Sequence, residues 1–558
     1  MTRRIGVFIC ECGTNISDKV DISKLIEAIS SVEGVAVAER FRLLCSPDGR
    51  SYLEKRIVDE DLTHVVVAAC SPREHQQTFM SVCDRSGLNP YVLALANIRE
   101  QCAWITEDLG ESTSKAIRMV KAVIGRVARQ VPLEKKELAI NPDVLVIGGG
   151  IAGLEASLAL ASPERTVYLV ERTPDLGGRA LHIQRTFPDM GSLAERVRKM
   201  VDGVLSNDHI RVMTSSELEN LVGFFGNYEV LVREKGVDGD AVEVMVGAVI
   251  LAIGADMFDC SSMEELGYGH LDKVITADEL ETMLNEDNLA MEGNLRSVAF
   301  VHCVGREQVG YCSGICCRYS LKLSKQLREL MPLIKVTHIF RDMCVPGKES
   351  EECYRDAIRE GSEFVLGPLP QVKSKGDRLE LILAQGEETA SIEADMVVLS
   401  PAMVPAKGAE EVARMANVPV GPDGFFLERH QKLAPVMTVR DGICVVGCAR
   451  GPASSKEAAV QARAGAGTIL ATLVPGRRIE PEVMTSHIAD AFCQGCRSCI
   501  EVCSYGAISF DERRKIAVVN EVICRGCGNC VAVCPSGAAS LKHSTFDQLY
   551  QEIMEAVR

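Results

Sequence analysis

A repeat of cysteines near the end of the chain constrains the fold more than any other feature. Two runs of four cysteines share the spacing C-x2-C-x2-C-x3-C and lie 31 residues apart. This spacing brings three thiolates to one [4Fe–4S] cluster, while the fourth thiolate of each run ligates the cluster of the other run. One cluster is therefore expected on Cys493, Cys496, Cys499 and Cys534, and a second on Cys524, Cys527, Cys530 and Cys503. Structural zinc, which also uses C-x2-C pairs, is the alternative.

Charge and cysteine content narrow the class of protein. The 558 residues include 23 cysteines and carry a formal net charge of −16. An acidic surface repels phosphate backbones, so nucleic acid is not an expected partner. No apolar run approaches the roughly 18 residues of a membrane span, and the start of the chain is charged too soon for a signal peptide. We therefore expect a cytoplasmic protein whose cysteines serve metal or redox chemistry.

A glycine-rich turn predicts a dinucleotide site. The apolar run Val144–Ile147 leads into Gly148-x-Gly150-x-x-Gly153, and the next apolar run ends at Glu171. Such glycines allow a pyrophosphate to approach a helix N-terminus, and the acid accepts a hydrogen bond from the ribose. A glycine turn that binds no nucleotide is the alternative. The predicted binding residues are Gly148, Gly150, Ile151, Ala152, Gly153, Glu171, Arg172, Gly178, Arg179, Ala252, Gly254, Gly447 and Cys448.

Flavoproteins similar to thioredoxin reductase share further segments with this chain, and these favour FAD over NAD. The segments are Leu176–Arg179, Ile250–Gly254 and Gly442–Ala466. Cys448 stands where those proteins have an Asp that contacts the ribityl chain. A disulfide reductase would also need a cysteine pair beside the flavin, yet no cysteine occurs between Cys102 and Cys260. Direct use of a small disulfide is therefore not expected.

A third group of cysteines takes the place of a second nucleotide fingerprint. After the apolar run Val298–Val301 the chain reads His302-Cys303-Val304-Gly305-Arg306, so direct use of NAD(P)H is not expected either. Four thiols within fifteen residues predict one further cluster, with buried inert thiols as the alternative. The expected ligands are Cys303, Cys312, Cys316 and Cys317. Cys344 and Cys353 are interpreted as structural.

The first part of the chain predicts a small parallel α/β domain. Apolar runs alternate with segments of helical spacing, the runs being Ile5–Cys10, Phe41–Cys45, Val65–Cys70 and Tyr91–Ala96. Three of these runs end in cysteine, and parallel strands bring their carboxyl ends to one edge. Cys10, Cys45, Cys70 and Cys102 could meet there around a cluster, with Cys12 as a spare ligand. The pattern alone leaves ordinary buried cysteines equally open.

Composition and motifs together divide the chain into six parts. At the C-terminus, apolar residues at helical spacing (Phe546, Leu549, Ile553 and Val557) predict an amphipathic helix that packs on its own domain, with a contact to a partner as the alternative. A helical segment is also expected from Ser112 to Leu138. The predicted parts are an N-terminal cysteine-cluster domain (1–138), a doubly wound FAD domain in two pieces (139–255 and 395–483) around a second, degenerate NAD(P)-type α/β domain (256–394), an α+β two-cluster module (484–545) and a closing helix (546–558).

These residues resemble the A-subunit family of heterodisulfide reductases over nearly the whole length. The resemblance is carried by Cys10–Gly13, Ala69–Arg73, Asn97–Cys102, Gly148–Gly153, Leu176–Arg179, Cys303–Cys317 and the C-terminal repeat, which resembles bacterial ferredoxins. It implies FAD in a thioredoxin-reductase-like core and clusters at both the Cys303 group and the N-terminal domain. Methanogen members carry a further ferredoxin module inserted in the core. The stretch 179–255 lacks cysteine here, so this is a short form without that module.

The resemblance implies an oxidoreductase subunit that relays electrons within a cytoplasmic complex, and in several such complexes the flavin is thought to bifurcate electrons. Expected partners are other subunits, donor modules of hydrogenase or dehydrogenase type, and ferredoxin; a dimer is compatible with the sequence. The flavin itself is the expected reactive centre, with no catalytic side chain. Two alternatives remain: an autonomous NAD(P)H or disulfide oxidoreductase, and a passive electron wire or scaffold with a vestigial flavin site.

Overall fold

The computed structural model describes residues 3–236, 241–286, 295–385 and 388–558, and it separates into two compact units. One unit contains Met1–Leu138 together with Glu480–Arg558, and the other contains Ala139–Ile479. In the described part of the chain, every helix is too short or too polar to span a bilayer. Each unit is described by itself below.

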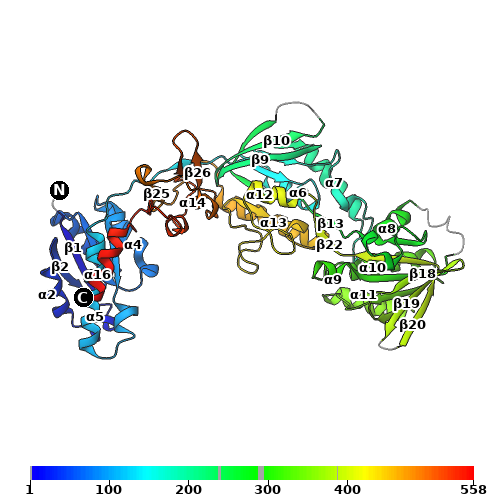
Figure 1. The fold of residues 1–558 in the computed structure, drawn as a ribbon, viewed down its shortest axis with the longest axis horizontal. Helices are drawn as coiled ribbons and strands as arrows, with labels where there is room; N and C mark the ends of the chain where they lie inside the picture. The colour runs from blue at the N-terminus through cyan, green and yellow to red at the C-terminus, as the bar shows by residue number, and fades with distance from the viewer. Residues whose placement is uncertain (1–2, 237–240, 287–294, 386–387) are drawn as a thin grey trace. The chain divides into compact units, whose positions relative to one another are not determined.

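The N-terminal part of the first unit is a parallel four-stranded sheet covered by helices on both faces (Figure 1). The strand order is β2-β1-β3-β4, with bounds β1 Ile5–Cys10, β2 Val35–Phe41, β3 His64–Ala69 and β4 Leu93–Asn97. Its helices are α1 Thr14–Ser17, α2 Ile22–Ser30, α3 Pro47–Asp59, α4 Pro72–Arg85 and α5 Leu109–Val127. Side chains of α2 and α5 pack on one face of β1, and those of α3 and α4 pack on the other. Full burial on both faces explains why β1 is apolar throughout and why β3 is apolar after His64.

Two of the predicted elements in this domain are displaced. The strand predicted at Phe41–Cys45 lies earlier, at β2, and the residues after it form the turn that Ser46 caps at the start of α3. β2 is a half-exposed edge strand in which Glu39 and Arg40 interrupt the apolar residues, so hydrophobicity alone does not give its bounds. The helix expected from Ser112 to Leu138 is α5, which ends at Val127.

The ferredoxin-like part of the first unit consists of two antiparallel strand pairs and two single-turn helices. The pairs are β25 (Ser486–Ile488) with β28 (Ala539–Leu541) and β26 (Ile508–Asp511) with β27 (Ile516–Val519). The helices α14 (Ser498–Glu501) and α15 (Asn529–Ala532) begin within the two cysteine runs. This arrangement confirms the predicted α+β module.

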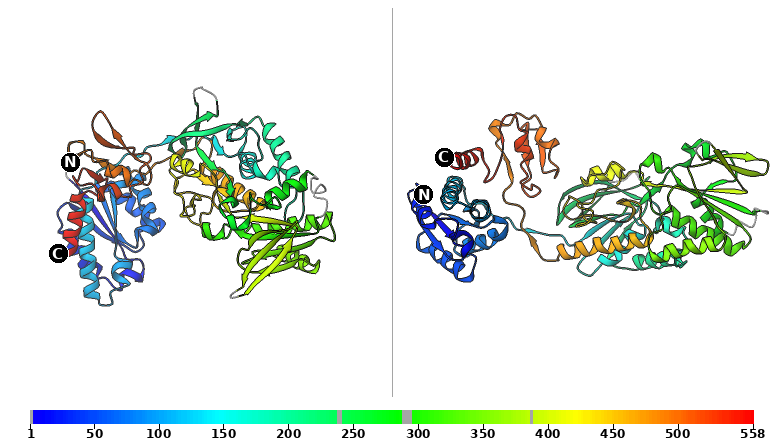
Figure 2. Two further views of the ribbon diagram at one scale, coloured as in Figure 1. Left: turned by 45° about the vertical axis from the view of Figure 1, so that its right-hand side comes forward. Right: turned by 90° about the horizontal axis from the view of Figure 1, so that it is seen from below.

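The last helix, α16 (Phe546–Val557), lies against α5 of the N-terminal domain (Figure 2). Arg126 donates to Glu552 at 3.1 Å, Arg129 donates to Asp547 at 2.7 Å, and the buried Gln548 donates to the carbonyl of Arg129. The polar face of the helix therefore makes the contact, while the apolar stripe Phe546, Leu549, Ile553 and Val557 is exposed. The prediction that this stripe packs on its own domain is wrong, because ion pairs with two arginines of α5 orient the helix instead.

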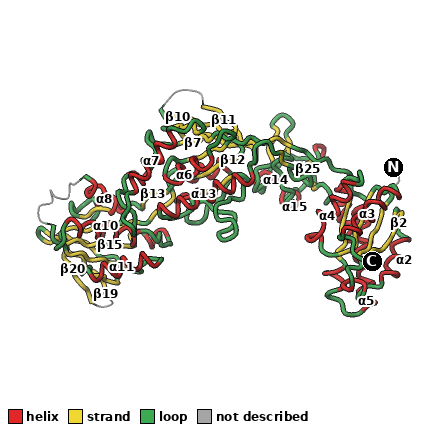
Figure 3. The backbone as a smooth tube through the Cα atoms, turned by 180° about the vertical axis from the view of Figure 1, so that it is seen from behind, coloured by secondary structure: helices red, strands yellow, loops and turns green. Residues whose placement is uncertain are grey.

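The second unit contains two doubly wound sheets, each with a three-stranded antiparallel sheet beside it (Figure 3). The first parallel sheet has the order β23-β12-β6-β7-β8, with bounds β6 Val144–Ile147, β7 Val167–Val170, β8 Ile210–Met213, β12 Ala248–Leu251 and β23 Ile443–Val445. Helices α6 (Ile151–Leu160), α7 (Leu193–Leu205) and α13 (Ser455–Thr472) cover one face. The other face packs on α12 (Ala409–Ala416) and on strands β9 (Ser216–Phe224), β10 (Asn227–Glu234) and β11 (Val242–Val246).

The second parallel sheet has the order β14-β21-β15-β16-β17. Its strands are β14 Val274–Thr276, β15 Ser297–Val304, β16 Lys335–Phe340, β17 Glu363–Leu366 and β21 Met396–Pro401, and its antiparallel neighbours are β18 Gln371–Lys375, β19 Arg378–Gln385 and β20 Glu388–Ala394. The helices are α8 Ala277–Asn285, α9 Arg306–Val309, α10 Cys316–Leu330 and α11 Lys348–Arg359. A short antiparallel pair, β13 (Ala255–Met257) with β22 (Met403–Pro405), carries the chain out of the first sheet and back.

Strand β21 corrects the predicted domain division. The residue pattern assigns Met396–Ser400 to the returning piece of the FAD domain, but β21 lies between β14 and β15 in the second sheet. The chain returns to the first sheet only after β22. Central strands of either parallel sheet are apolar on both faces, so the residue pattern does not say which sheet such a strand joins.

Candidate functional site

The glycine fingerprint lies at the carboxyl edge of the first sheet, between β6 and α6. Gly148 has φ +107°, and a Cβ there would lie 2.3 Å from the carbonyl oxygen of Ala252. A Cβ at Gly153 would lie 1.8 Å from the carbonyl oxygen of Gly148, so α6 packs on β6 only without a side chain at this position. By contrast, a Cβ at Gly150 would meet nothing within 4 Å, which leaves open space above the helix N-terminus. These three environments match the roles of the glycines in a pyrophosphate site.

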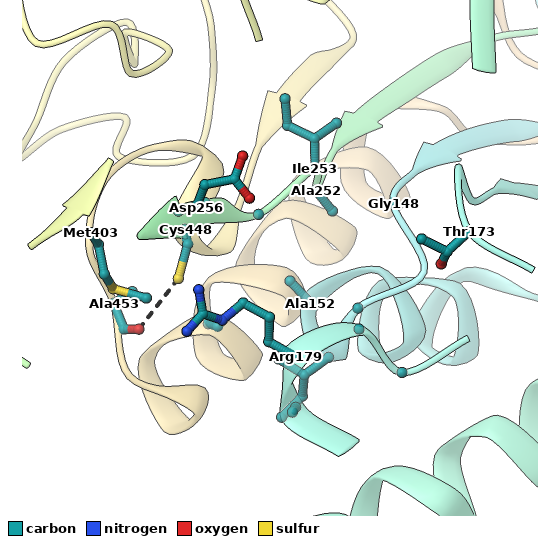
Figure 4. A pocket seen from close by; sticks show the side chains of 18 of the residues that line it. Gly148, Ala152, Thr173, Arg179, Ala252, Ile253, Asp256, Met403, Cys448 and Ala453 are labelled. Atoms are coloured by element: carbon teal, nitrogen blue, oxygen red, sulfur yellow. Dashed lines mark hydrogen bonds between the residues drawn. The ribbon is translucent and has the colours of Figure 1, made fainter. Parts of the chain in front are cut away.

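A cavity of about 610 Å³ opens beside this turn, within the second unit (Figure 4). All predicted nucleotide residues line it except Gly153 and Gly447. Gly447 has φ +65°, and a Cβ there would lie 2.9 Å from the Cβ of Ala152, so it is needed for packing beside the cavity. The cavity is large, and the surface that lines it is mainly apolar, as is usual for cofactor sites.

Glu171 follows β7 and is nearly buried at the cavity. Its carboxylate accepts hydrogen bonds from the backbone N–H of Gly149 at 2.6 Å and from the backbone N–H and the hydroxyl of Thr173 at 2.8 and 2.7 Å. The acid therefore holds the glycine turn in place as well as facing the cavity. The prediction that it accepts a hydrogen bond from a ribose stays a prediction.

Cys448 lies opposite the glycine turn, before the N-terminus of α13. Its thiol donates to the carbonyl of Ala453 at 3.3 Å, and burial raises its pKa, which keeps the thiol neutral (Figure 4). The positive charge of Arg179 acts on this thiol in the opposite direction. Ser454 caps α13 with Glu457 in a capping box, and the first residues of α13 line the cavity. The positive end of the helix dipole thus faces the space where a flavin would bind.

The Cys303 group reaches the same cavity through one of its members, Cys316. β15 carries Cys303 near its end with φ +62°, and Cys316 is the first residue of α10 and lines the cavity. The thiol of Cys317 donates to Cys316, which lowers the pKa of Cys316 and raises that of Cys317. No second glycine fingerprint follows β15; the cysteine group occupies that end of the strand instead.

Cys344 belongs to this neighbourhood, although sequence reasoning set it aside as structural. Its backbone N–H donates to the sulfur of Cys317 at 3.5 Å, and its thiol acts electrostatically on Cys312. Cys353 lies on α11, and the structure places no other thiol of the group beside it. The loop after β16 brings Cys344 to the group, and no local spacing in the sequence signals this approach.

A buried ion pair adjoins the cavity and was also missed. Lys322 of α10 and Glu281 of α8 contact each other and are 1% and 3% exposed at their side chains. Glu281 also accepts a hydrogen bond from the backbone N–H of Gln184 at 3.1 Å, which ties the second sheet to the first. The Lys322 ammonium lies 4.4 Å from the ring centre of Tyr319, a residue of the cavity wall, and desolvation lowers its pKa.

The C-terminal repeat brings thiols of its two runs near one another, and the crossed ligand sets stay a prediction. Burial raises the pKa of Cys530, and Cys524, Cys527 and Cys503 all act electrostatically on its thiol. Two backbone N–H groups point at ligand sulfurs: Ser486 at Cys524 and Ala507 at Cys503, both at 3.3 Å. Within the described residues, no three His, Cys, Asp or Glu side chains are placed to share one metal ion.

The N-terminal cysteines divide into two environments. Cys12 and Cys45 both act electrostatically on Cys10, and Cys12 also acts on Cys70. Cys102 instead lies in the core on the opposite face of the sheet, where its sulfur is 3.3 Å from the sulfur of Met119 on α5. The structure therefore gathers Cys12 with three of the predicted ligands, and it turns Cys102 toward α5.

Comparisons with known proteins match two segments of the chain to family models. A family model described as pyridine nucleotide-disulphide oxidoreductase matches residues 142–462, and one described as 4Fe-4S dicluster domain matches residues 492–538. Together with the cavity and the cysteine groups, they define a flavin- and iron–sulfur-containing oxidoreductase subunit.

Full-length relatives narrow the class to one family. One of the iron–sulfur A subunits of CoB–CoM heterodisulfide reductase from Methanopyrus kandleri is 33% identical over 603 aligned positions, which cover 91% of this chain and 92% of the relative. The corresponding A subunit of Methanocaldococcus jannaschii is 32% identical and covers 94% of both chains. This chain belongs to the A-subunit family of heterodisulfide reductases, and its role is electron transfer. Among solved structures, T. acidophilum thioredoxin reductase matches 59% of this chain and 99% of its own, with a TM-score of 0.42 and 12% identity.

Proposed function

We propose that this chain is the electron hub of a cytoplasmic heterodisulfide-reductase-like complex, with one FAD and four [4Fe–4S] clusters. The observation that carries the proposal is the shared cavity: Cys316 of the Cys303 group and Gly150 of the nucleotide turn line the same space. A two-electron carrier and a one-electron carrier would therefore be neighbours in one unit, which a relay between them requires.

The residues around the cavity fit FAD. Bound there, FAD would supply exchange of two electrons, and each cluster would supply exchange of one. Gly150 leaves room for the pyrophosphate at the N-terminus of α6, and Glu171 fixes the turn through Gly149. The N-terminus of α13 places positive charge at the opposite wall, where it would favour the anionic form of a reduced flavin, whereas the charge of Arg179 is paired with Asp278.

The cysteine groups supply the remaining sites. Cys303, Cys312, Cys316 and Cys317 would hold a cluster at the cavity, and the N–H of Cys344 would tune it through Cys317. The crossed sets of the C-terminal repeat would hold two more. For the N-terminal cluster we favour Cys10, Cys12, Cys45 and Cys70, because electrostatic interactions with Cys10 or Cys12 connect these four while Cys102 faces Met119.

Names of relatives suggest the partners. The relative from Methanothermobacter thermautotrophicus is the A subunit of an H2:CoB–CoM heterodisulfide,ferredoxin reductase, a name with one donor and two acceptors. By analogy, we propose that this chain receives electrons from a hydrogenase- or dehydrogenase-type module. It would divide them between a disulfide-reducing partner and a ferredoxin.

Iron and flavin content test the proposal directly. Protein purified without oxygen should contain about sixteen irons, four for each cubane cluster, and one FAD per chain. Colorimetric iron analysis and the absorbance of released flavin measure both. About eight irons would confine the clusters to the C-terminal repeat, and absence of FAD would favour the passive wire.

Replacing Cys312 by alanine should remove about four irons per chain, because one thiolate of the cluster at the cavity is lost. The matched control is Cys353→Ala, which removes a cysteine of the same domain that lies apart from the group. Iron per chain and the electron paramagnetic resonance (EPR) spectrum of the reduced protein report the result. Full iron content in Cys312→Ala would contradict the assignment of this cluster.

A further inference from the structure

A short π-helix follows β4 in the N-terminal domain and places two opposite charges beside the cysteines. This helix, η2 (Arg99–Ala103), begins shortly after the sheet edge at which Cys10 and Cys70 lie at their strand ends. The side chain of Asn97 accepts a hydrogen bond from the backbone N–H of Glu100 at 3.1 Å and so fixes its first turn. π-Helical turns are rare in proteins, and those that do occur are often found at functional sites.

Arg99 holds its guanidinium against a cysteine sulfur. One terminal nitrogen of the guanidinium donates to the sulfur of Cys12 at 3.5 Å, and the other donates to the carboxylate of Glu100 at 2.6 Å. The guanidinium carbon lies 4.7 Å from the ring centre of Trp104. Three contacts in different directions therefore fix the cation, whose side chain is 19% exposed.

Glu100 completes the pair and brings a negative charge to the same place. One of its oxygens accepts both bonds from Arg99, whereas the other, Oε2, is buried and has no hydrogen-bond partner among the described residues. Arg99 joins the Glu100 carboxylate to the sulfur of Cys12 through two hydrogen bonds, so a positive and a negative charge both lie beside the cysteines.

We propose that Arg99 and Glu100 set the reduction potential of the N-terminal cluster in opposite directions, an inference that rests on the proposed function because it needs a cluster at Cys10, Cys12, Cys45 and Cys70. Reduction adds one negative charge to a cluster, so a nearby cation favours the reduced form and a nearby anion disfavours it. Partial burial of both side chains limits screening by water and salt. Arg99 raises the potential, and Glu100 lowers it.

Single neutral substitutions in the full-length, anaerobically purified protein test the inference. Arg99→Gln should lower the midpoint potential of the N-terminal cluster, and Glu100→Gln should raise it. A redox titration followed by EPR measures both, with the N-terminal signal identified as the one that Cys70→Ala removes. Arg99→Lys, which keeps the charge, should stay close to the wild-type potential. Arg85→Gln on α4, whose partner is the exposed Glu54, should leave the potential unchanged.

Several results would overturn the inference. If the midpoint potential moved in the same direction in Arg99→Gln and Glu100→Gln, or moved in neither, the pair would act only on structure. Loss of the cluster's irons in Arg99→Gln would show that Arg99 holds the site together rather than tuning it. Wild-type protein without the N-terminal signal would overturn the fourth cluster of the proposed function as well, whereas a signal that does not move would overturn the inference alone.

Trp104 supplies an independent readout of the guanidinium. It is the single tryptophan of the chain, and it is 57% exposed. Removing the Arg99 guanidinium from its ring should therefore change the tryptophan emission of the full-length protein, while Glu100→Gln leaves the cation on the ring. Unchanged emission in Arg99→Gln would show that the cation does not occupy the place that the inference requires.

Discussion

Replacing Gly153 by alanine should leave the protein with at least about tenfold less bound FAD, although the change adds only one methyl group. The new Cβ would lie 1.8 Å from the carbonyl oxygen of Gly148, which is backbone and belongs to the same turn. α6 must then move away from β6, and this moves Gly150 and the helix N-terminus that would face the pyrophosphate. A loss of about 1.4 kcal/mol in binding free energy already lowers affinity tenfold.

Gly467 offers the matched control for this prediction. It also lies in a helix that covers the first sheet, α13, but a Cβ there would meet nothing within 4 Å. Gly467→Ala should therefore keep its flavin and gain about 0.5–1 kcal/mol of stability from the better helix propensity of alanine. Flavin per chain after gel filtration, with iron content as a check on the clusters, measures both variants. A full complement of FAD in Gly153→Ala would contradict the assignment of this turn to the cofactor.

Features that depend on backbone geometry could be predicted from the sequence. Gly148, Gly150 and Gly153 lie at three positions with different steric needs, and each need is visible in the spacing of the fingerprint. The cysteine repeat fixes its own loops in the same way, because Gly495 and Gly526 occur at the same place in both runs and both have positive φ. Local spacing specifies such turns without help from the rest of the fold.

Features that depend on distant segments could not be predicted. Cys344 reaches Cys317 from the loop after β16, and Lys322 meets Glu281 across two helices. The residues around Lys322 give no sign of its burial, because a lysine between leucines on a helix is usually on the solvent side. The predictions for β21 and for the orientation of α16 were wrong for the same reason. Segments remote in sequence decide which sheet a strand joins and which face of a helix is covered.

Neutralising one member of the buried pair Lys322–Glu281 should destabilise the second unit by about 3–5 kcal/mol, because the remaining charge is buried without its partner. Lys322→Met leaves the Glu281 carboxylate with the N–H of Gln184, and Glu281→Gln leaves the ammonium against the ring of Tyr319. Either change should lower the melting temperature of the FAD-containing unit, which the release of flavin fluorescence on heating reports.

A double variant separates the cost of an unpaired charge from the value of the pair itself. Replacing both Lys322 and Glu281 by methionine removes both charges and keeps apolar volume, so the double variant should be clearly more stable than either single variant. The exposed pair Arg185–Glu329, with both side chains 44% exposed, is the control. Glu329→Gln should leave the melting temperature unchanged, since an exposed pair contributes little. If the double variant were as unstable as the single variants, loss of packing rather than an uncompensated buried charge would be the cause.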